Sequence, residues 1–305
     1  MTLMRESICD AISLMSTQSL TNEVLGYSPD ARLLIINCDD FGMCFSQNAG
    51  TIQSIETGIA SSCSLMMPPA WGVHAAQFLQ ENNEVNFAVH LTALSEYTCY
   101  KWGPLMPVDE VPTLVNEDGH FLADDEFDEI IRSAECRELE TEFRSQIEVV
   151  FGFGLHPTHL DSHYGLHTSR PDIFDLTVRL AHEYGLALRV TGKDNIETAR
   201  EFGFPTVDHP VLDSGSLVPT EICSYLERLM RVLPVGLSEW ALHPGVNTDE
   251  IRAIMATPKA PGMSGTPEQR QADLDFLTSE KTAALVKEEG IQIISYRELQ
   301  PFWQS

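Results

Sequence analysis

The chain has 305 residues, 43% of them apolar, which is enough to bury one sizeable hydrophobic core in a single domain. Its 45 acidic residues outnumber its 19 basic residues and give a formal charge of -26. This balance excludes the broad basic surface that follows a nucleic-acid backbone or an anionic membrane, so we expect neither as a partner.

Seven cysteines are scattered along the chain without a C-x-x-C pair, which is typical of reduced thiols rather than of a disulfide framework. The opening MTLMRESICDAISLMS contains acidic residues where a signal peptide needs an uninterrupted apolar stretch. No apolar run is long enough to span a membrane. We therefore expect a cytoplasmic protein.

The predicted elements begin with an amino-terminal helical extension, residues 1–30, which combines one amphipathic helix with a turn at Gly26 to Pro29. Residues 31–305 are expected to form one domain in which strand-like and helix-like runs alternate. The predicted strands are 33–37, 61–67, 86–91, 157–160, 186–190, 239–243 and 291–296. The predicted helices are 47–57, 125–152, 171–184, 220–233 and 266–289, and the predicted long loops are 92–122 and 249–265.

This alternation favours a parallel sheet covered by helices. Such a sheet either closes into a barrel or stays open and doubly wound, and the second form usually carries a glycine-rich phosphate loop after its first strand. Here the first strand is followed by NCDDFG, whose two acids would repel a phosphate. We therefore predict an α/β fold of the TIM-like (β/α) barrel type, a single domain behind the helical extension.

The most informative segment is LLIINCDDFG, in which an apolar strand ends directly in Asp39 and Asp40. The carboxyl ends of barrel strands face the active-site mouth, so both carboxylates are expected there, one to bind a metal ion and one to stay free as a base. A single acid after a strand is more typical of a helix cap. Two acids followed by Phe-Gly favour a functional role.

Histidines mark three further strands. His90 stands near the end of the strand in NFAVHLT, and His243 ends the strand in SEWALHPG. The segment HPTHLDSHYGLH holds a cluster in which alternation puts His159, Asp161 and His163 on one face while the strand lasts. A lone strand histidine is more often a hydrogen-bonded core residue, and a polar loop that caps the next helix explains part of the cluster. Acids or histidines at four strand ends are hard to explain by packing and are natural for a site at a barrel mouth.

One carboxylate with two imidazoles suits zinc or another divalent first-row ion and leaves a position for water. Such an ion lowers the pKa of its water toward neutrality, which makes hydrolysis the natural chemistry. Attack on an amide also needs a base for the water proton and an acid for the departing amine. Asp39 and His243 are the candidates for these two roles.

The segments LLIINCDDFG, VHLT, THLDSH, SEWALHPG and the terminal R-x-x-x-x-x-x-L-T-S followed by IQIISYREL resemble the YdjC-like carbohydrate deacetylases in order and spacing, from residue 31 to 299. The resemblance implies a TIM-like barrel, one divalent metal ion, Mg or Zn, and removal of an acetyl group from an N-acetylated amino sugar or chitooligosaccharide. It implies Asp39 as base and His243 as acid or transition-state partner. The implied metal ligands are Asp40, His90 and His163.

The candidates for substrate binding are Arg189, His159, Asp161 and His167. Arg189 matches a position where the family commonly keeps an arginine near the site, although a strand-end arginine can equally pair with Asp161 or Glu239 as structural support. The chain departs from the family pattern in VHLTA and SHYGLH, both around the expected substrate cleft. The exact acetylated sugar therefore stays open.

Other functions compete with this hypothesis. A non-catalytic metal- or sugar-binding regulatory protein on the same barrel is the main alternative, but such proteins tend to lose their proton-transfer residues, and Asp39 and His243 are present. A metallophosphoesterase or an isomerase is a third possibility, although phosphoesters usually call for clustered Lys or Arg. Family resemblance and the apolar carboxyl end, Leu299 to Trp303, also suggest a homodimer.

Overall fold

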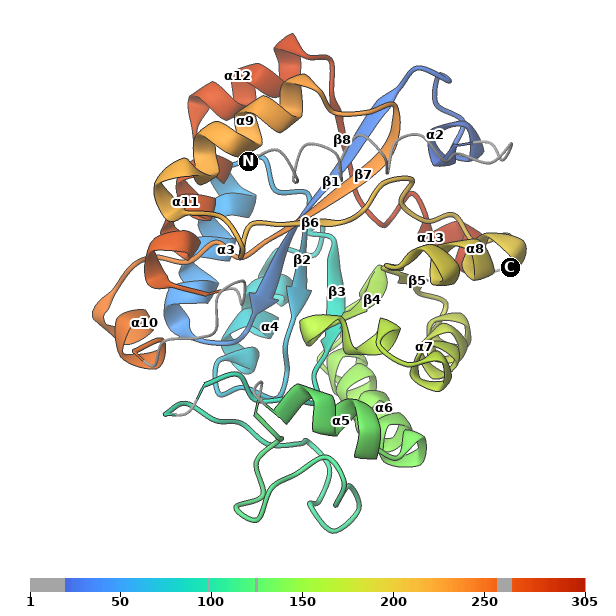
Figure 1. Cartoon of the computed structure of the whole chain (residues 1–305), viewed down its shortest axis with the longest axis vertical. Coiled ribbons are helices and arrows are strands. Elements are labelled where there is room, and N and C mark those ends of the chain that lie inside the picture. Colours follow the sequence, from blue (N-terminus) through green and yellow to red (C-terminus); the bar gives the residue numbers. More distant parts are fainter. Residues whose placement is uncertain (1–19, 98, 124–125, 257–264, 305) are drawn as a thin grey trace.

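A computed structural model describes residues 20–97, 99–123, 126–256 and 265–304. Its strands form one sheet in the order β5-β4-β3-β2-β1-β7-β6, with β8 paired to β1 (Figure 1), and every pairing is parallel. The strands are β1 (Arg32–Phe41), β2 (Ser62–Leu65), β3 (Phe87–Leu91), β4 (His159–Ser162), β5 (Ala187–Leu188), β6 (Leu212–Asp213), β7 (Gly236–Leu242) and β8 (Gln292–Ile294).

Helices surround this sheet (Figure 1). They are α2 (Thr21–Val24), α3 (Phe45–Thr57), α4 (Gly72–Glu81), α5 (Phe127–Ser133), α6 (Cys136–Gly152), α7 (Pro171–Tyr184), α8 (Lys193–Glu201), α9 (Ile222–Arg231), α10 (Asp249–Ile254), α11 (Pro267–Leu277), α12 (Glu280–Glu288) and α13 (Gln300–Trp303), with 3-10 turns η2 (His163–Thr168) and η3 (Pro219–Glu221). In the part of the chain that the structure describes, no helix is both long and apolar enough to cross a membrane.

Strand β1 forms the centre of the fold. Its residues Leu33 to Ile36 are fully buried, since the sheet continues on both sides and helices lie outside it. Along one edge β7 pairs with Arg32 to Cys38, and along the other β8 pairs with the beginning of β1 and β2 with its end. Strands buried in this way read as continuous apolar runs, which is why LLII predicted a strand so clearly.

The predicted TIM-like architecture is confirmed in its parallel strands and outer helices but not in its closure. No strand pairing joins β5 to β6 among the described residues, so the sheet is a half-barrel. Both edge strands have only two residues, Ala187–Leu188 and Leu212–Asp213, which is too short to build a continuous ladder across the opening.

Helix α7 shows how local sequence sets an element. Its predicted bounds are confirmed, because Pro171 occupies the first turn and Gly185 ends the helix with a left-handed φ of 66°. Two long predicted helices are instead divided. The stretch 125–152 contains α5 and α6, and the stretch 266–289 contains α11 and α12. Helices α4, α8 and α10 were not predicted; α10 lies in the predicted loop 249–265, whose residues 257–264 are outside the described part of the chain.

The two chain ends bear on two further predictions. Residues 1–19 of the predicted helical extension lie outside the described residues, and residues 20–30 contain only the short α2 and turns. At the carboxyl end Leu299 and Trp303 are fully buried, and the Trp303 ring stacks on Phe204 at 4.2 Å. These residues therefore do not supply an apolar surface for a dimer, and the homodimer stays a prediction.

Candidate active site

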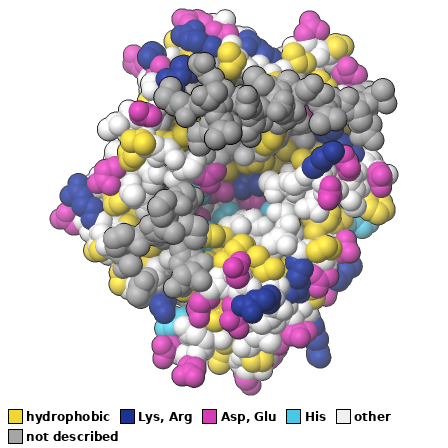
Figure 2. All heavy atoms as spheres, viewed as in Figure 1, with side chains coloured by type: hydrophobic (Ala, Val, Ile, Leu, Met, Phe, Trp, Pro, Cys, Tyr) yellow, Lys and Arg dark blue, Asp and Glu magenta, His cyan; other side chains and the backbone are white. Residues whose placement is uncertain are grey.

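Seven of the nine predicted site residues meet in one cavity where the strands end. A cavity of about 460 Å³ opens there, in a hollow where histidine, acidic and basic side chains gather near the centre of the face shown in Figure 2. Its lining includes Asp39, Asp40, His90, His163, Tyr164, His167, Arg189, Asp213 and His243. Because all strands run parallel, residues up to about 200 positions apart in sequence converge at this edge.

A β-bulge presents the two adjacent carboxylates. Cys38 pairs with Cys63 and Phe41 with Leu65, so Asp39 and Asp40 together oppose one residue of β2. Asp40 takes a left-handed φ of 64°, which is uncommon for a residue other than glycine. In a regular strand two successive side chains would point to opposite faces. Both carboxylates instead line the cavity.

Gly42 makes the turn after this bulge possible. It has a φ of 115°, and an added Cβ would lie 2.3 Å from the carbonyl oxygen of Met66 and 3.1 Å from Cα of Gly72. Its N–H donates to Oδ1 of Asn48 on α3 at 2.7 Å. The glycine of D-D-F-G therefore has a steric role: it lets the chain turn closely past the β2 loop directly after the acids.

Asp40, His90 and His163 form a buried group that could hold a metal ion, with one ligand atom from each within 4.8 Å of the others. Oδ1 of Asp40 lies 3.6 Å from Nε2 of His90 and 3.1 Å from Nδ1 of His163. This oxygen is buried, and no hydrogen bond of acceptable geometry reaches it from the described residues. A buried carboxylate oxygen that faces two imidazole nitrogens is the donor set expected of a site for a divalent ion.

Asp161 orients His90 toward that group. Its Oδ1 accepts from Nδ1 of His90 at 2.7 Å, which leaves Nε2 facing Asp40, and its Oδ2 accepts from the Ser64 hydroxyl at 2.5 Å. Burial lowers the pKa of His90, but the Asp161 carboxylate outweighs it and raises this pKa to about 10. A carboxylate behind a ligating histidine is the usual support of a metal site. Asp161 is fully buried and does not line the cavity, which argues against the predicted direct contact with substrate.

Arg189 lies under the candidate base rather than in open solvent. Nη1 and Nη2 donate to Oδ2 and Oδ1 of Asp39 at 2.7 and 2.9 Å, and Nε donates to Glu239 at 2.7 Å. Burial alone would raise the pKa of Asp39, but the Arg189 charge and its hydrogen bonds hold this pKa below its ordinary value. Arg189 does touch the cavity, yet its bonds are directed at carboxylates of the chain. This is the structural-support alternative raised from the sequence.

His243 reaches the cavity from the end of β7. Its Nε2 lies 3.9 Å from Oδ2 of Asp40, and its backbone N–H donates to Asp273 at 2.9 Å. Its Nδ1 is buried and has no hydrogen-bond partner in the part of the chain that the structure describes. Burial lowers the pKa of His243, but the negative charges of Asp40 and Asp213 outweigh it and raise this pKa. The imidazole is therefore biased toward its protonated form.

The remaining two candidates for substrate binding are buried. His159 is fully buried, stacks on Tyr296 at 3.8 Å and does not line the cavity, and burial lowers its pKa to about 3. His167 lines the cavity, but its two ring nitrogens contact Ser162 at 2.6 Å and the Arg189 carbonyl at 2.7 Å. The geometry gives both histidines packing and positioning contacts, and a sugar contact of either stays a prediction.

Two cavity neighbours were missed by the sequence analysis. Arg270 on α11 is fully buried and donates to Oδ2 of Asp40 from both Nη atoms at 3.0 Å, and the only sequence signal for it was the R of R-x-x-x-x-x-x-L-T-S. Tyr164 lines the cavity beside His163 with a left-handed φ of 56°. A strained residue in a cavity wall points to a functional constraint.

The family model described as YdjC-like protein matches residues 33–288. A carbohydrate deacetylase from Geobacillus stearothermophilus is 32% identical over 269 residues, which cover 88% of this chain and 98% of that protein. A chitooligosaccharide deacetylase from Yersinia enterocolitica is 30% identical over 267 residues, which cover 87% of this chain and 98% of that protein. The crystal structure of an Enterococcus faecalis protein described as a cellobiose-phosphate cleavage protein superimposes with a TM-score of 0.73 at 24% identity, over 88% of this chain and 99% of that chain, which supports the fold alone.

Proposed function

The chain belongs to the YdjC-like protein family, and on that premise we propose that it is a metal-dependent hydrolase that removes the acetyl group from an N-acetylated amino sugar or chitooligosaccharide. The observation that carries the proposal is the convergence of three groups in one cavity. These are Oδ1 of Asp40, which faces two imidazoles and accepts no hydrogen bond from the described residues, the carboxylate of Asp39, and the imidazole of His243. A cytoplasmic location stays a prediction from the sequence.

Asp40, His90 and His163 would hold one divalent ion, Mg or Zn. When bound, it would supply Lewis acidity that lowers the pKa of a water molecule and polarises the acetyl carbonyl. The chain contributes the rigidity of this set, because Asp161 fixes the ring of His90 and the bulge fixes Asp40.

We assign the role of base to Asp39. Its carboxylate is held by Arg189 and by Nδ2 of Asn37, which donates to Oδ1 at 2.6 Å. The lowered pKa keeps Asp39 ionised near neutral pH, so it is ready to accept the proton of the attacking water. The lowered pKa also makes Asp39 a weak base. Such a base suffices only for a water molecule whose own pKa would be lowered by the bound ion.

We assign the role of acid to His243. The acetamide nitrogen must gain a proton before it can depart as an amine, and a histidine whose pKa is raised holds that proton near neutral pH. His243 directly follows β7, whose Leu242 pairs with Cys38 of β1, so it enters the cavity from the strand next to the one that carries Asp39. We propose that Asp39 accepts the proton of the water and that His243 donates a proton to the departing amine.

The sugar is proposed to bind against the wall formed by Tyr164 and η2. Aromatic rings are good surfaces for the apolar faces of sugar rings. The Tyr164 ring packs against two other rings, with centroid distances of 6.0 Å to Phe127 and 4.9 Å to His163. This wall lies in SHYGLH, the segment that departs from the family pattern. Substrate preference is therefore expected to depend on it.

The test is acetate release from N-acetylglucosamine oligomers by the purified protein, before and after chelation and after zinc or magnesium is added back. We expect release that stops with chelator and returns with metal. Asp39→Asn should abolish turnover while metal binding persists, and Asp30→Asn, an exposed acid just before β1, is the matched control that should leave both unchanged.

Two outcomes would contradict the proposal. Metal and sugar binding with no acetate released from any oligomer would favour the non-catalytic metal- or sugar-binding regulatory protein. Turnover that survives Asp39→Asn would remove Asp39 from the role of base.

A further inference from the structure

Arg270 is a fully buried cation with no role in the chemistry described above. It lies in the first turn and a half of α11, whose start is fixed by a capping box between Thr266 and Gln269. It begins R-x-x-x-x-x-x-L-T-S, a motif that the proposed reaction does not use. A buried guanidinium is costly unless its hydrogen bonds are satisfied, so its partners indicate what it is for.

Those partners centre on one oxygen of a proposed metal ligand. Nη1 and Nη2 both donate to Oδ2 of Asp40 at 3.0 Å. Nη1 also donates to Oε1 of Gln47 at 2.8 Å, and Nη2 to the Tyr97 hydroxyl at 3.2 Å. The guanidinium is thus tied to β1, α3 and the loop that follows β3, and it cannot leave Asp40 without breaking all of these contacts.

The two oxygens of Asp40 therefore have different environments. Oδ2 accepts from Arg270, whereas Oδ1 faces the imidazoles of His90 and His163 and accepts no hydrogen bond from any described residue. A carboxylate bound in this way can offer an ion one oxygen only. Magnesium and calcium are hard ions that prefer several oxygen ligands, while zinc, cobalt and nickel accept imidazole nitrogen readily.

The charge of Arg270 acts in the same direction. A guanidinium beside the proposed ligand Asp40 repels a divalent ion. The two imidazoles are strong donors to zinc and offset this repulsion for zinc better than the single carboxylate oxygen does for magnesium. Glu96, from the loop after β3, lies 3.9 Å from Arg270 and 3.6 Å from His163 and adds a carboxylate beside the pair. Without Arg270 the site would offer magnesium more oxygen and more negative charge.

We propose that Arg270 is a positioning residue that sets the metal selectivity of the site: it restricts Asp40 to one oxygen and thereby favours imidazole-preferring ions over magnesium. The inference rests on the metal site of the proposed function. It concerns which ion the site selects, not whether acetate is released.

The test is calorimetric binding of Mg²⁺ and Zn²⁺ to the full chain and its variants, without substrate. Arg270→Met should bind Mg²⁺ about tenfold more tightly, with a much smaller change for Zn²⁺, because magnesium depends on carboxylate charge that Arg270 no longer offsets, whereas zinc also draws on the two imidazoles. Arg270→Lys keeps the positive charge but loses the two-nitrogen contact with Asp40, so its Mg²⁺ affinity should lie between those of the wild type and Arg270→Met. In the Co²⁺-loaded proteins the visible absorption should weaken in Arg270→Met, as expected for a higher coordination number.

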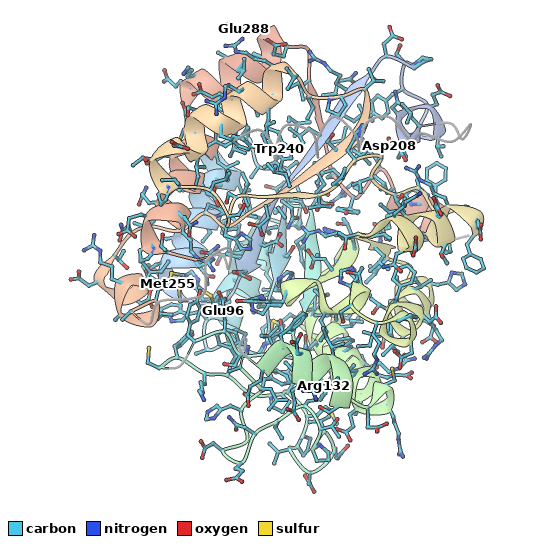
Figure 3. The ribbon with its side chains drawn as sticks, in the orientation of Figure 1. Glu96, Arg132, Asp208, Trp240, Met255 and Glu288 are labelled. Atoms are coloured by element: carbon cyan, nitrogen blue, oxygen red, sulfur yellow. The ribbon has the colours of Figure 1, made fainter. Side chains whose placement is uncertain are left out.

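The matched control is Arg200→Met. Arg200 also pairs with a buried acid, Asp208, at 2.7 Å, and Figure 3 shows Asp208 beside α2, well apart from Glu96 at the site. This control should leave both affinities unchanged. If Arg270→Met does not fold, Arg270→Lys tests the inference instead. We then expect it to bind Mg²⁺ more tightly than the wild type, with a gain smaller than about tenfold.

Two results would overturn the inference, and they are distinguishable. An unchanged ratio of Mg²⁺ to Zn²⁺ affinity, or equal weakening for both ions, would show that Arg270 only supports the fold of the site. A wild-type protein that binds neither ion would overturn the metal site itself and, with it, the proposed function.

Discussion

The Arg189 guanidinium binds the Asp39 carboxylate through two hydrogen bonds, from Nη1 to Oδ2 at 2.7 Å and from Nη2 to Oδ1 at 2.9 Å. The same side chain lies 3.0 Å from Asp161 and donates to Glu239 at 2.7 Å. One cation thus holds the proposed base together with the acid that orients His90. The base and the metal ligand are therefore parts of one ionic network and are not expected to respond independently to mutation.

Replacing Arg189 by Met should move the acidic limb of the kcat/KM profile to higher pH. Without the guanidinium, burial acts alone and raises the pKa of Asp39, so the base stays protonated to a higher pH. The same change should lower the free energy of unfolding by roughly 3–5 kcal/mol, because buried carboxylates lose their partner. Arg189→Lys keeps the charge and should shift the limb less. An acidic limb that stays in place would mean that another group is the base.

Metal affinity should depend on pH through His90. In the ion-free protein Asp161 raises the pKa of His90 to about 10 against the effect of burial, so the ring carries a proton that the ion must displace. Below that pKa the affinity should rise about tenfold per pH unit, with one proton released per ion. Calorimetry at pH 8 in buffers of different ionisation enthalpy measures this proton. Asp161→Asn should weaken the dependence, and binding without proton release would contradict the assignment of His90.

Asp273 should make the protein less stable as pH rises from 4 to 7. Burial raises its pKa from 3.8 to about 6, against the bonds that it accepts from the His243 backbone and the Ser214 hydroxyl. A folded-state pKa above the unfolded value gives stability that is present below the unfolded pKa and lost as pH rises through the folded one, about 3 kcal/mol here. The side chain of Asp273→Asn cannot ionise. Urea unfolding should therefore show the free energy of unfolding of this variant rising relative to that of the wild type, by up to about 3 kcal/mol, between pH 4 and 7. A constant difference would contradict the raised pKa.

Two substitutions of Tyr164 should separate its backbone strain from its role in the wall. Both Tyr164→Ala and Tyr164→Asn remove the ring and should raise KM for an acetylated oligomer to a similar extent, with metal affinity unchanged. Asparagine adopts the left-handed φ of 56° more readily than alanine, so the Asn variant should be more stable by about 0.5–1 kcal/mol. An unchanged KM in both variants would remove Tyr164 from the sugar wall.

The acidic strand end was predictable because its signal is local. A run of apolar residues followed by Asp39 and Asp40 predicts both a strand and a polar strand end, and the parallel sheet then brings the histidines to the same edge. The bulge was not predictable, and it extends β1 to Phe41, beyond the predicted end at residue 37. It depends on the fit of Gly42 against Met66, which no local pattern reports.

The alternation argument for the histidine cluster holds only while strand β4 lasts. Strand β4 stops at Ser162, and His163 opens the 3-10 turn η2, so the face shared by His159 and Asp161 does not continue to His163. His159 precedes Asp161 by two residues on β4, so it lies farther from the strand end, where its ring stacks on Tyr296. Period-2 reasoning predicts the face of a side chain but not its depth below the cavity.

Arg270 could not be placed from the sequence because its partners come from distant segments. It is 230 positions from Asp40 and 223 from Gln47. On a helix that reads as ordinary and amphipathic, a single arginine predicts a solvent-exposed charge. Edge strand β5 was predicted at 186–190 but is shorter, and edge strand β6 was not predicted, since two residues carry no periodicity. The opening of the half-barrel between these two strands was therefore missed.

The close packing at Gly42 limits how the candidate active site can be engineered. Any side chain there would have its first carbon 2.3 Å from a backbone oxygen, a clash that no rotamer relieves, and the backbone in question belongs to the loop that leads into α4. A saturation library across the mouth can therefore vary the cavity walls, but Gly42 must stay glycine for a steric reason, just as Asp39 and Asp40 must stay for the chemistry proposed for them.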